Sequence, residues 1–311
     1  MVSKDTIYVW SNPQHHTRIF FENAKSRGEK RKEVALIIGT QPSVLIAASN
    51  DFPIGDSELG VAGALDGTGI RVSQCESIDL EVPASSEMVL EGYFDCSSYA
   101  DEGPFGEFTG FQSPVQNFGL IFKVTCITHQ QDPIHYCFYN GKPISEHHIV
   151  WRCLDELLAL SQMKSRFPFL KSLSLSPEGC RDFLLILQVD KALNFRTYKP
   201  DYVKNLLLAS VAYFPRTKFI VAVDDDVNIE SMSDVIWAVS THVRPDKDID
   251  LVNGTWTTPL DPSSDQGLSS KLFIDATTKK DFKGMPTALP NEIVSLVDEK
   301  WDSYGIKSFS K

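Results

Sequence analysis

Phe183-Leu-Leu-Ile-Leu-Gln-Val189 and Lys218-Phe-Ile-Val-Ala-Val223 are two nearly continuous apolar runs, and they decide the fold of the second half of the chain. Such runs are typical of strands that are buried on both faces of a parallel sheet. Between them, Tyr202 to Tyr213 spaces its apolar residues three and four positions apart, as a helix does. A second helical pattern, Ser233 to His242, follows, with Ser231 or Ser233 as its N-cap. This order of strands and helices predicts an α/β domain with a buried sheet.

The residues before this domain favour β-structure. Val34 to Gly39 predicts a buried strand, whereas Ser43 to Ala48 is compatible with a strand or a helix. Three later segments alternate or are rich in β-branched and aromatic residues, and they predict strands at Glu87–Phe94, Leu120–Thr128 and Ile134–Tyr139. We therefore expect residues 30 to 140 to be mostly β.

The pattern changes after Pro143. Val150 to Leu160 has the apolar spacing of a helix. Residues 253 to 290 are rich in Ser, Thr, Gly and Pro, and we expect a long surface excursion there before a last helix over Glu292 to Trp301. The chain is accordingly divided into two domains, residues 1–142 and 143–311.

The composition excludes several classes of protein. The 311 residues hold 30 Lys and Arg against 41 Asp and Glu, a net charge of −11, which argues against binding nucleic acid or anionic lipid through bulk charge. No apolar run approaches the ~20 residues of a membrane helix. The first residues contain an acid and lack a continuous apolar core, so they do not indicate a secretory signal. The six cysteines form no CxxC pair, as is typical of reduced thiols, so we expect a cytoplasmic location.

The sharpest local feature is the stretch Glu102-Gly-Pro-Phe-Gly-Glu107. Two glycines and a proline between the acids predict a tight loop, which can hold both carboxylates in one pocket. If one acid is desolvated or repelled by the other, its pKa rises and it can donate a proton near neutral pH. The alternative is an acidic turn on the surface, and the pattern alone leaves both interpretations open.

Other candidates are weaker when taken singly. Glu58 can ligate a metal or stabilise a helix N-terminus. The Gln14-His15-His16 stretch offers imidazole to a metal or phosphate, although adjacent histidines are usually just solvated. Lys218 opens a predicted strand and can pair with a phosphate, and Asp224-Asp225-Asp226 ends that strand, where α/β ligands gather but loop acids are also ordinary.

Several separate motifs, in order along nearly the whole chain, resemble the UbiD family of reversible decarboxylases. They are Ser77–Gly92, the acidic loop Glu102–Phe111, Pro177-Glu-Gly-Cys180, Thr217–Asn228, Asp234–Val239 and Arg244-Pro245.

The resemblance implies an α+β fold, in which a split β-barrel domain like that of flavin reductases precedes an α/β C-terminal domain with an oligomerisation helix. It also implies a prenylated FMN cofactor, bound with Mn²⁺ and K⁺. Glu107 then corresponds to the proton donor or acceptor at the substrate carbon, and Glu102 to a member of its acid network. The implied metal ligands are His15 and Glu58, and the implied cofactor contacts are Gln14, Ser49, Asn50 and, at the phosphate, Lys218.

The sequence departs from the family at one motif. Family members carry an Asn-x-Gly-x-Tyr-Arg strand just before the region that matches Lys4 to Trp10, and its Asn ligates the metal while its Arg completes an Arg/Glu/Glu group. No such stretch occurs in the 311 residues. We expect a short form whose missing part comes from another chain, a mis-started reading frame, or a homologue that has given up decarboxylation.

Two functions follow from the resemblance. The first is decarboxylation of an aromatic or α,β-unsaturated acid, a quinone precursor such as a polyprenyl-hydroxybenzoate among them, as in ubiquinone biosynthesis. The second is an accessory subunit that needs a separate chain to supply the Arg and the Asn. The implied partners are a flavin prenyltransferase that supplies the cofactor and further copies of the chain in a homo-oligomer.

Overall fold

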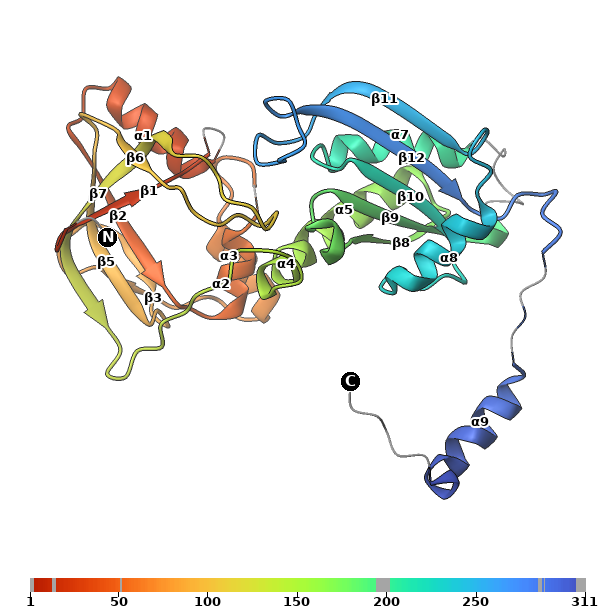
Figure 1. Ribbon diagram of the computed structural model, residues 1–311. Coiled ribbons are helices and arrows are strands. Elements are labelled where there is room, and N and C mark those ends of the chain that lie inside the picture. The colour runs from red at the N-terminus through yellow and green to blue at the C-terminus, as the bar shows by residue number, and fades with distance from the viewer. Residues whose placement is uncertain are drawn as a thin grey trace. The chain divides into compact units, whose positions relative to one another are not determined.

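The longest strand, β7 (Gln116–His129), organises an antiparallel sheet in the first half of the chain. The sheet has the order β1-β7-β5-β2, and β6 also pairs with β7. Figure 1 shows these strands side by side. Their bounds are β1 Thr6–Val9, β2 Arg31–Ile38, β5 Met88–Asp95 and β6 Ala100–Glu102.

This computed structural model describes residues 3–12, 15–50, 52–193, 202–284, 287 and 289–305. The chain forms two compact units, Met1–Thr277 and Thr278–Lys311. Within the described ranges, no helix is long and apolar enough to cross a membrane.

Helix α1 (His16–Ser26) covers the first sheet. Its Phe21 and Ala24 are buried against Phe94 and Phe122, so the apolar face of the helix closes the core of this sheet. Two further helices, α2 (Pro42–Ala48) and α3 (Glu58–Asp66), pack on each other in a small separate core. A hairpin follows, formed by β3 (Val72–Gln74) and β4 (Glu81–Pro83).

A second sheet, with the order β11-β12-β10-β9-β8, forms the later half of the first unit. Strands β9, β10 and β12 are parallel, while the edge strands β8 and β11 are antiparallel to their neighbours. The bounds are β8 Leu170–Leu175, β9 Leu184–Val189, β10 Phe219–Asp224, β11 Ile249–Trp256 and β12 Leu268–Ala276.

Helices cover both faces of this second sheet. Alternate residues of β10 pack toward opposite sides: Ile220 lies in a core with α5 (Arg152–Arg166) and α7 (Tyr202–Tyr213), and Val221 lies in another with α8 (Met232–His242). The continuous apolar runs of the sequence are explained by this double burial. The predicted strands at β9 and β10 and the predicted helices at α7 and α8 are confirmed.

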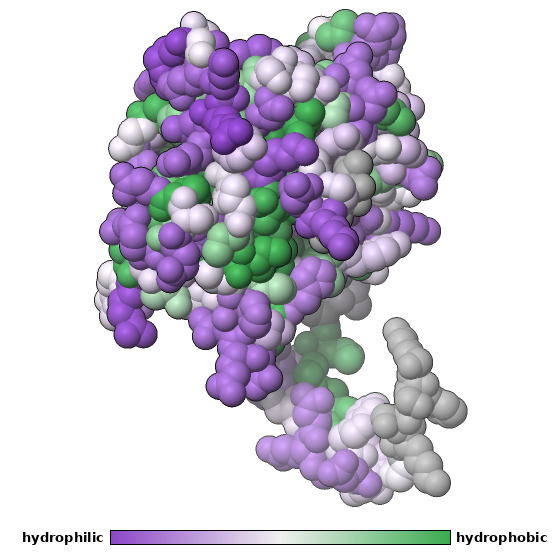
Figure 2. All heavy atoms as spheres, turned by 90° about the vertical axis from the view of Figure 1, so that its left-hand side faces the viewer, coloured by the Kyte–Doolittle hydropathy of each residue, from purple (hydrophilic) through white to green (hydrophobic). Residues whose placement is uncertain are grey.

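The remaining helices are short or terminal. Helix α4 (Glu146–Val150) precedes α5, and a 3₁₀ turn, η1 (Pro177–Gly179), precedes β9. The second unit contains α9 (Asn291–Lys300) and the 3₁₀ turn η2 (Trp301–Tyr304). The surface on the side of the first sheet is mostly hydrophilic, with a patch of apolar side chains near the middle of the view (Figure 2).

Two sequence-based expectations are wrong. No strand forms over residues 134 to 139, which run as irregular chain. The expected surface excursion after Asn253 instead contains the end of β11 and all of β12, a central strand between β10 and β11. Only Leu272 to Ile274 form a consecutive apolar run in β12, and the polar residues before them hide the strand in the sequence. Ser270 bonds to Asn253, and Lys271 bonds to distant carbonyl oxygens. The ambiguous segment Ser43–Ala48 lies in a helix.

Candidate functional site

The acidic loop of the sequence leaves the end of β6 and packs against a later segment of the chain. A side chain at Gly106 would place its Cβ 2.8 Å from the carbonyl oxygen of Asn140, and one at Gly110 would meet Lys142 at 2.8 Å, with a backbone φ of +82°. Glycine is required at both positions because of this close approach. The loop is thereby pressed onto residues 140–142, and Glu107 lies between the two contacts.

Phe108, which follows Glu107 directly, fixes the loop to the second half of the first unit. Its ring lies 5.8 Å from that of Phe183 and 6.2 Å from that of His147, centroid to centroid. Its carbonyl oxygen accepts a hydrogen bond from Nε2 of buried His148, at 2.7 Å. The position of Glu107 therefore depends on contacts from both halves of the unit.

Glu107 is a buried acid, with 8% of its surface exposed. Burial raises the pKa of its carboxyl, and the charge of Glu102 raises the pKa further, while hydrogen bonds from the side chains of Ser113 and Asn140 and from the Phe108 amide oppose the rise. Asn140 also donates to the carbonyl oxygen of Gly106, at 2.9 Å, so it holds both the loop and the acid.

Glu102 is the second acid of the loop. Burial raises the pKa of its carboxyl, and its Oε2 is buried without a hydrogen-bond partner among the described residues. Two acids with raised pKa values, close enough to influence one another, can hold and transfer a proton near neutral pH. Such a pair is unlike an ordinary surface turn, where both acids would be solvated.

A cavity of about 1000 Å³ lies within the first unit. Four of the predicted site residues line it: His15, Ser49, Asn50 and Glu58. They come from helix ends, since His15 is the N-cap of α1, Ser49 the C-cap of α2, and Glu58 the first residue of α3. Glu58 begins helix α3 and also lines the cavity, so its position is compatible with both predicted roles, stabilising a helix N-terminus and binding a ligand.

The donors for a metal are incomplete. Nδ1 of His16 lies 3.3 Å from Oε1 of Glu58, and His15 lines the same cavity. In the part of the chain that the structure describes, no group of three or more His, Cys, Asp or Glu side chains is placed to hold a metal ion. The residues present therefore do not fit a metal by themselves.

The opposite wall of the cavity carries a chain of charges that sequence analysis missed. Asp182 accepts a hydrogen bond from Nη1 of Arg216 at 3.1 Å and lies 3.5 Å from Nε of Arg181. Arg181 also pairs with Asp155, whose pKa is raised by burial although Arg181 opposes the rise. The cavity has about the size of cofactor pockets in general, enough for a ligand as large as a flavin nucleotide. Its two arginines stand among four acids, Glu58, Glu81, Asp155 and Asp182.

The sequence did contain signals for these missed residues. Arg181 directly follows the Pro177–Cys180 motif, and Arg216 lies two positions before Lys218. Asn140 directly follows the segment Ile134–Tyr139 that was interpreted as a strand, and nothing in that pattern places its side chain beside Glu107.

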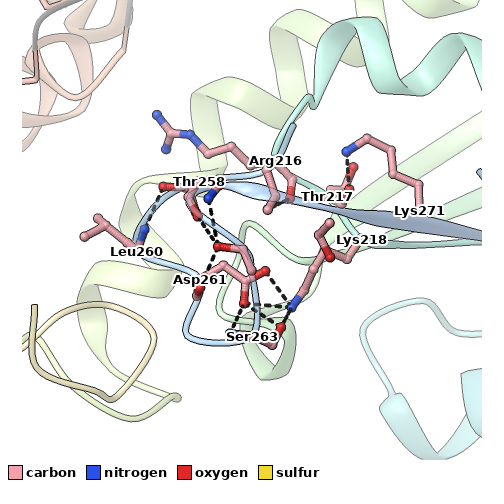
Figure 3. Close-up of polar contacts among 12 residues, drawn as sticks. Arg216, Thr217, Lys218, Thr258, Leu260, Asp261, Ser263 and Lys271 are labelled. Atoms are coloured by element: carbon pink, nitrogen blue, oxygen red, sulfur yellow. Dashed lines mark hydrogen bonds and ion pairs between the residues drawn. The ribbon is translucent and has the colours of Figure 1, made fainter. Parts of the chain in front are cut away.

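The other predicted residues lie elsewhere. Lys218 is not among the residues that line the cavity, and its ammonium group contacts Asp261 and Ser263 (Figure 3). Glu102 and Glu107 do not line the cavity either. Gln14 lies outside the described residues. Asp224 is fully buried, 3.5 Å from the ammonium group of Lys191.

Known proteins match this chain along most of its length. The family of 3-octaprenyl-4-hydroxybenzoate carboxy-lyases, UbiD, matches through its Rift-related domain over residues 1–143 and through its C-terminal domain over residues 148–276.

Among solved structures, the UbiD-class enzyme HmfF from Pelotomaculum thermopropionicum, in complex with FMN, is 29% identical with a TM-score of 0.86, and the match covers 96% of this chain and 65% of that one. The vanillic acid decarboxylase of Sedimentibacter hydroxybenzoicus, in open form, is 26% identical with a TM-score of 0.81, and the match covers 98% and 66%. The apo 3,4-dihydroxybenzoic acid decarboxylase of Klebsiella pneumoniae, 24% identical with a TM-score of 0.81 over 99% and 65%, shares the fold. The chain thus spans slightly less than two thirds of the length of these structures.

The raised pKa of Glu107 gives a prediction for stability. The folded protein holds this proton to a higher pH than the unfolded chain, whose glutamates titrate near about 4.3. The free energy of unfolding should therefore fall as the pH rises above that value and through the higher folded pKa. Glu107→Gln removes this titration, so the variant should become more stable than wild type as the pH rises.

Urea unfolding at a series of pH values, from about 4.5 to 8, measures the difference. Glu76→Gln supplies the matched control, because it makes the same substitution at an exposed glutamate outside the acidic loop. A constant difference between Glu107→Gln and wild type over this range would show that Glu107 does not titrate abnormally.

Proposed function

The chain belongs to the UbiD family of carboxy-lyases, and on this premise we propose that it takes part in the non-oxidative decarboxylation of an aromatic or α,β-unsaturated carboxylic acid with prenylated FMN. The observation that carries the proposal is the buried Glu107, held between two close backbone contacts with its pKa raised. The solved relatives include an HmfF structure with prenylated FMN and a vanillic acid decarboxylase, which supports the choice of cofactor and of substrate class.

The protein's part in this reaction is placement and proton supply. The flavin, when bound, supplies a ring that accepts the electron density left on carbon as CO₂ departs. Glu107 delivers a proton to the substrate carbon, because burial and the charge of Glu102 raise the pKa of its carboxyl and so disfavour early loss of that proton. Asn140 and Ser113 orient the carboxyl, because both donate hydrogen bonds to it.

The cavity is the proposed place of the cofactor. Ser49 and Asn50 would line the flavin there, and His15 and Glu58 would contribute two of the donors of Mn²⁺, with K⁺ nearby. Two side chains do not complete a metal site, so this assignment needs donors beyond these two. Gln14 remains a proposed contact by resemblance to the family. The resemblance also assigns Lys218 to the phosphate, but the pairing of Lys218 with the buried Asp261 argues against that contact.

Several finer features also remain proposals. The first sheet is proposed to be a split β-barrel, with the domain boundary at residue 142. A separate flavin prenyltransferase supplies the cofactor, and a polyprenyl-hydroxybenzoate of ubiquinone biosynthesis is one candidate substrate. The described cysteines are all free thiols, in line with the proposed cytoplasmic location.

A second candidate function is an accessory UbiD-like subunit. It is favoured by the buried Oε2 of Glu102, which has no hydrogen-bond partner among the described residues, at the place where the family's Asn-x-Gly-x-Tyr-Arg stretch would act. In the family this stretch brings an arginine to the two glutamates, and an arginine fork orients a carboxylate through two parallel hydrogen bonds. The subunit then works with a second chain that supplies this arginine.

Homo-oligomers are also proposed, with α9 as the contact. None of its residues is buried, although Ile293, Val294 and Leu296 are large and apolar. A helix with such an exposed apolar face is typical of a surface that becomes buried in an assembly.

Substitution of the proposed proton donor tests the reaction. Glu107→Gln keeps the size of the side chain but cannot exchange a proton, so we expect CO₂ release to fall by roughly 10² to 10⁴. Flavin content, read from the absorbance of protein made together with a flavin prenyltransferase, should be unchanged. Glu76→Gln again serves as control, and an equal rate in Glu107→Gln and wild type would remove Glu107 from the mechanism.

Supply of the arginine separates the two candidate functions. A segment that carries Asn-x-Gly-x-Tyr-Arg, fused before Met1 or added in trans, should raise H/D exchange at the substrate carbon by at least one power of ten, because charged hydrogen bonds contribute about 1.5 to 3 kcal/mol each. The same segment with Lys in place of Arg is the control. Equal, robust exchange without the segment would exclude the accessory function.

Charges placed on α9 test the assembly. Ile293→Asp combined with Leu296→Asp should convert an oligomer to a smaller species in size-exclusion chromatography with light scattering, because the charges cannot be buried without partners. Ser295→Asp, an exposed polar position of the same helix, should leave the mass unchanged. An unaltered mass in the double variant would place the contact elsewhere.

A further inference from the structure

Arg216 and Lys218 lie two residues apart just before β10, yet their surroundings differ. Nζ of Lys218 lies 2.9 Å from Oδ2 of Asp261 and 2.9 Å from Oγ of Ser263, and it sits over the ring of Phe183. The Lys218 side chain is 14% exposed and that of Asp261 only 1%. Moving the ammonium group to another anion would leave a buried carboxylate unpaired, which is costly.

The side chain of Arg216 is not held in a buried ion pair of this kind. It lines the cavity, 37% of it is exposed, and its guanidinium group is hydrogen-bonded to Asp182 through Nη1 alone. A guanidinium group has five N–H donors in a planar fork, so most of them remain available to a ligand. Figure 3 shows this side chain directed away from the pair formed by Lys218 and Asp261.

The backbone that carries Arg216 is held firmly. Nζ of Lys271, a residue only 2% exposed, donates to the carbonyl oxygens of Pro215 at 2.7 Å, Thr217 at 2.6 Å and Trp256 at 3.2 Å. The carbonyl oxygen of Arg216 itself accepts from Oγ1 of Thr257, at 2.8 Å. Three successive carbonyls are thus bound, so the origin of the Arg216 side chain is fixed before any ligand arrives.

Most of the other charged groups of the cavity are in ion pairs, and Glu81 is an exposed acid on its wall. Arg181 contacts both Asp155 and Asp182, and its side chain is 14% exposed. On the other side, His16 contacts Glu58. Of the two arginines that line the cavity, Arg216 is the more exposed, and it has the fewer acidic partners.

We infer that Arg216 receives the anionic group of the ligand in this cavity, either the phosphate monoester of the flavin or the carboxylate of the acid substrate. The inference rests on the proposed function for the identity of the ligand. The hydrogen bond to Asp182 orients the guanidinium group. The contacts of Lys271 with the carbonyl oxygens of Pro215 and Thr217 hold the backbone from which the Arg216 side chain reaches the cavity.

Flavins with and without a phosphate test the inference directly. Binding of FMN and of riboflavin is measured by flavin fluorescence in wild type, Arg216→Gln and a control, Arg27→Gln, at an exposed arginine outside the cavity. If the phosphate is the group received, Arg216→Gln should weaken FMN by about 10- to 100-fold and leave riboflavin unchanged. If the carboxylate is the group, Arg216→Gln should instead weaken benzoate by a similar factor, measured by calorimetry, and leave FMN unchanged.

A second variant compares Lys218 with Arg216. Lys218→Met combined with Asp261→Asn removes both charges of the buried pair, so no unpaired charge is left. This variant should keep the preference of wild type for FMN over riboflavin. The inference is overturned if the double variant at Lys218 and Asp261 abolishes the preference for FMN over riboflavin while Arg216→Gln keeps it. It is also overturned if Arg216→Gln changes neither FMN nor benzoate binding.

Titration with inorganic phosphate separates this inference from the proposed function. Wild type that binds no flavin, yet binds phosphate or benzoate in a manner that Arg216→Gln weakens, would contradict the use of a flavin and support the role of Arg216. Wild type that binds none of these anions would contradict both.

Discussion

The packing of Phe108 is the contact on which the arrangement of the candidate site depends. Its ring lies between Phe183 and His147, and its carbonyl oxygen is bound by His148. Because Glu107 is the preceding residue, the acid can hold its position only when the loop from the first sheet meets these later residues. The position of Glu107 thus depends on packing between the two halves of the first unit.

The neighbouring charged groups determine whether a buried carboxyl in this protein has a raised pKa or forms an ion pair. Burial and the neighbouring charge of Glu102 dominate at Glu107, so its pKa rises and the group is suited to carry a proton. Asp182, by contrast, is shared by Arg181 and Arg216, and Asp261 is paired with Lys218. These carboxylates act as fixed supports for cations. The same side-chain chemistry therefore gives an acid with a raised pKa in one place and an ion-pair partner in another.

Most of the secondary structure followed from local patterns. The runs at β9 and β10 and the helical spacing of α7 and α8 are properties of a few consecutive residues, and each predicted the observed element. Strand β12 could not be predicted in this way. It is a central strand because β10 and β11 pair with it on either side, and Lys271 is buried in it because distant carbonyls of Pro215, Thr217 and Trp256 surround its ammonium group.

The sequence by itself determined the two glutamates, the glycines that shape their loop, and the family to which the motifs belong. Tertiary structure alone decided that Asn140 would support Glu107, that Lys218 would be paired with Asp261, and that Arg216 would face the cavity. The physical reason is that a motif fixes only the chemistry and spacing of its own residues. Burial, pKa and the choice of ion-pair partner depend on groups that lie tens of positions away in the chain.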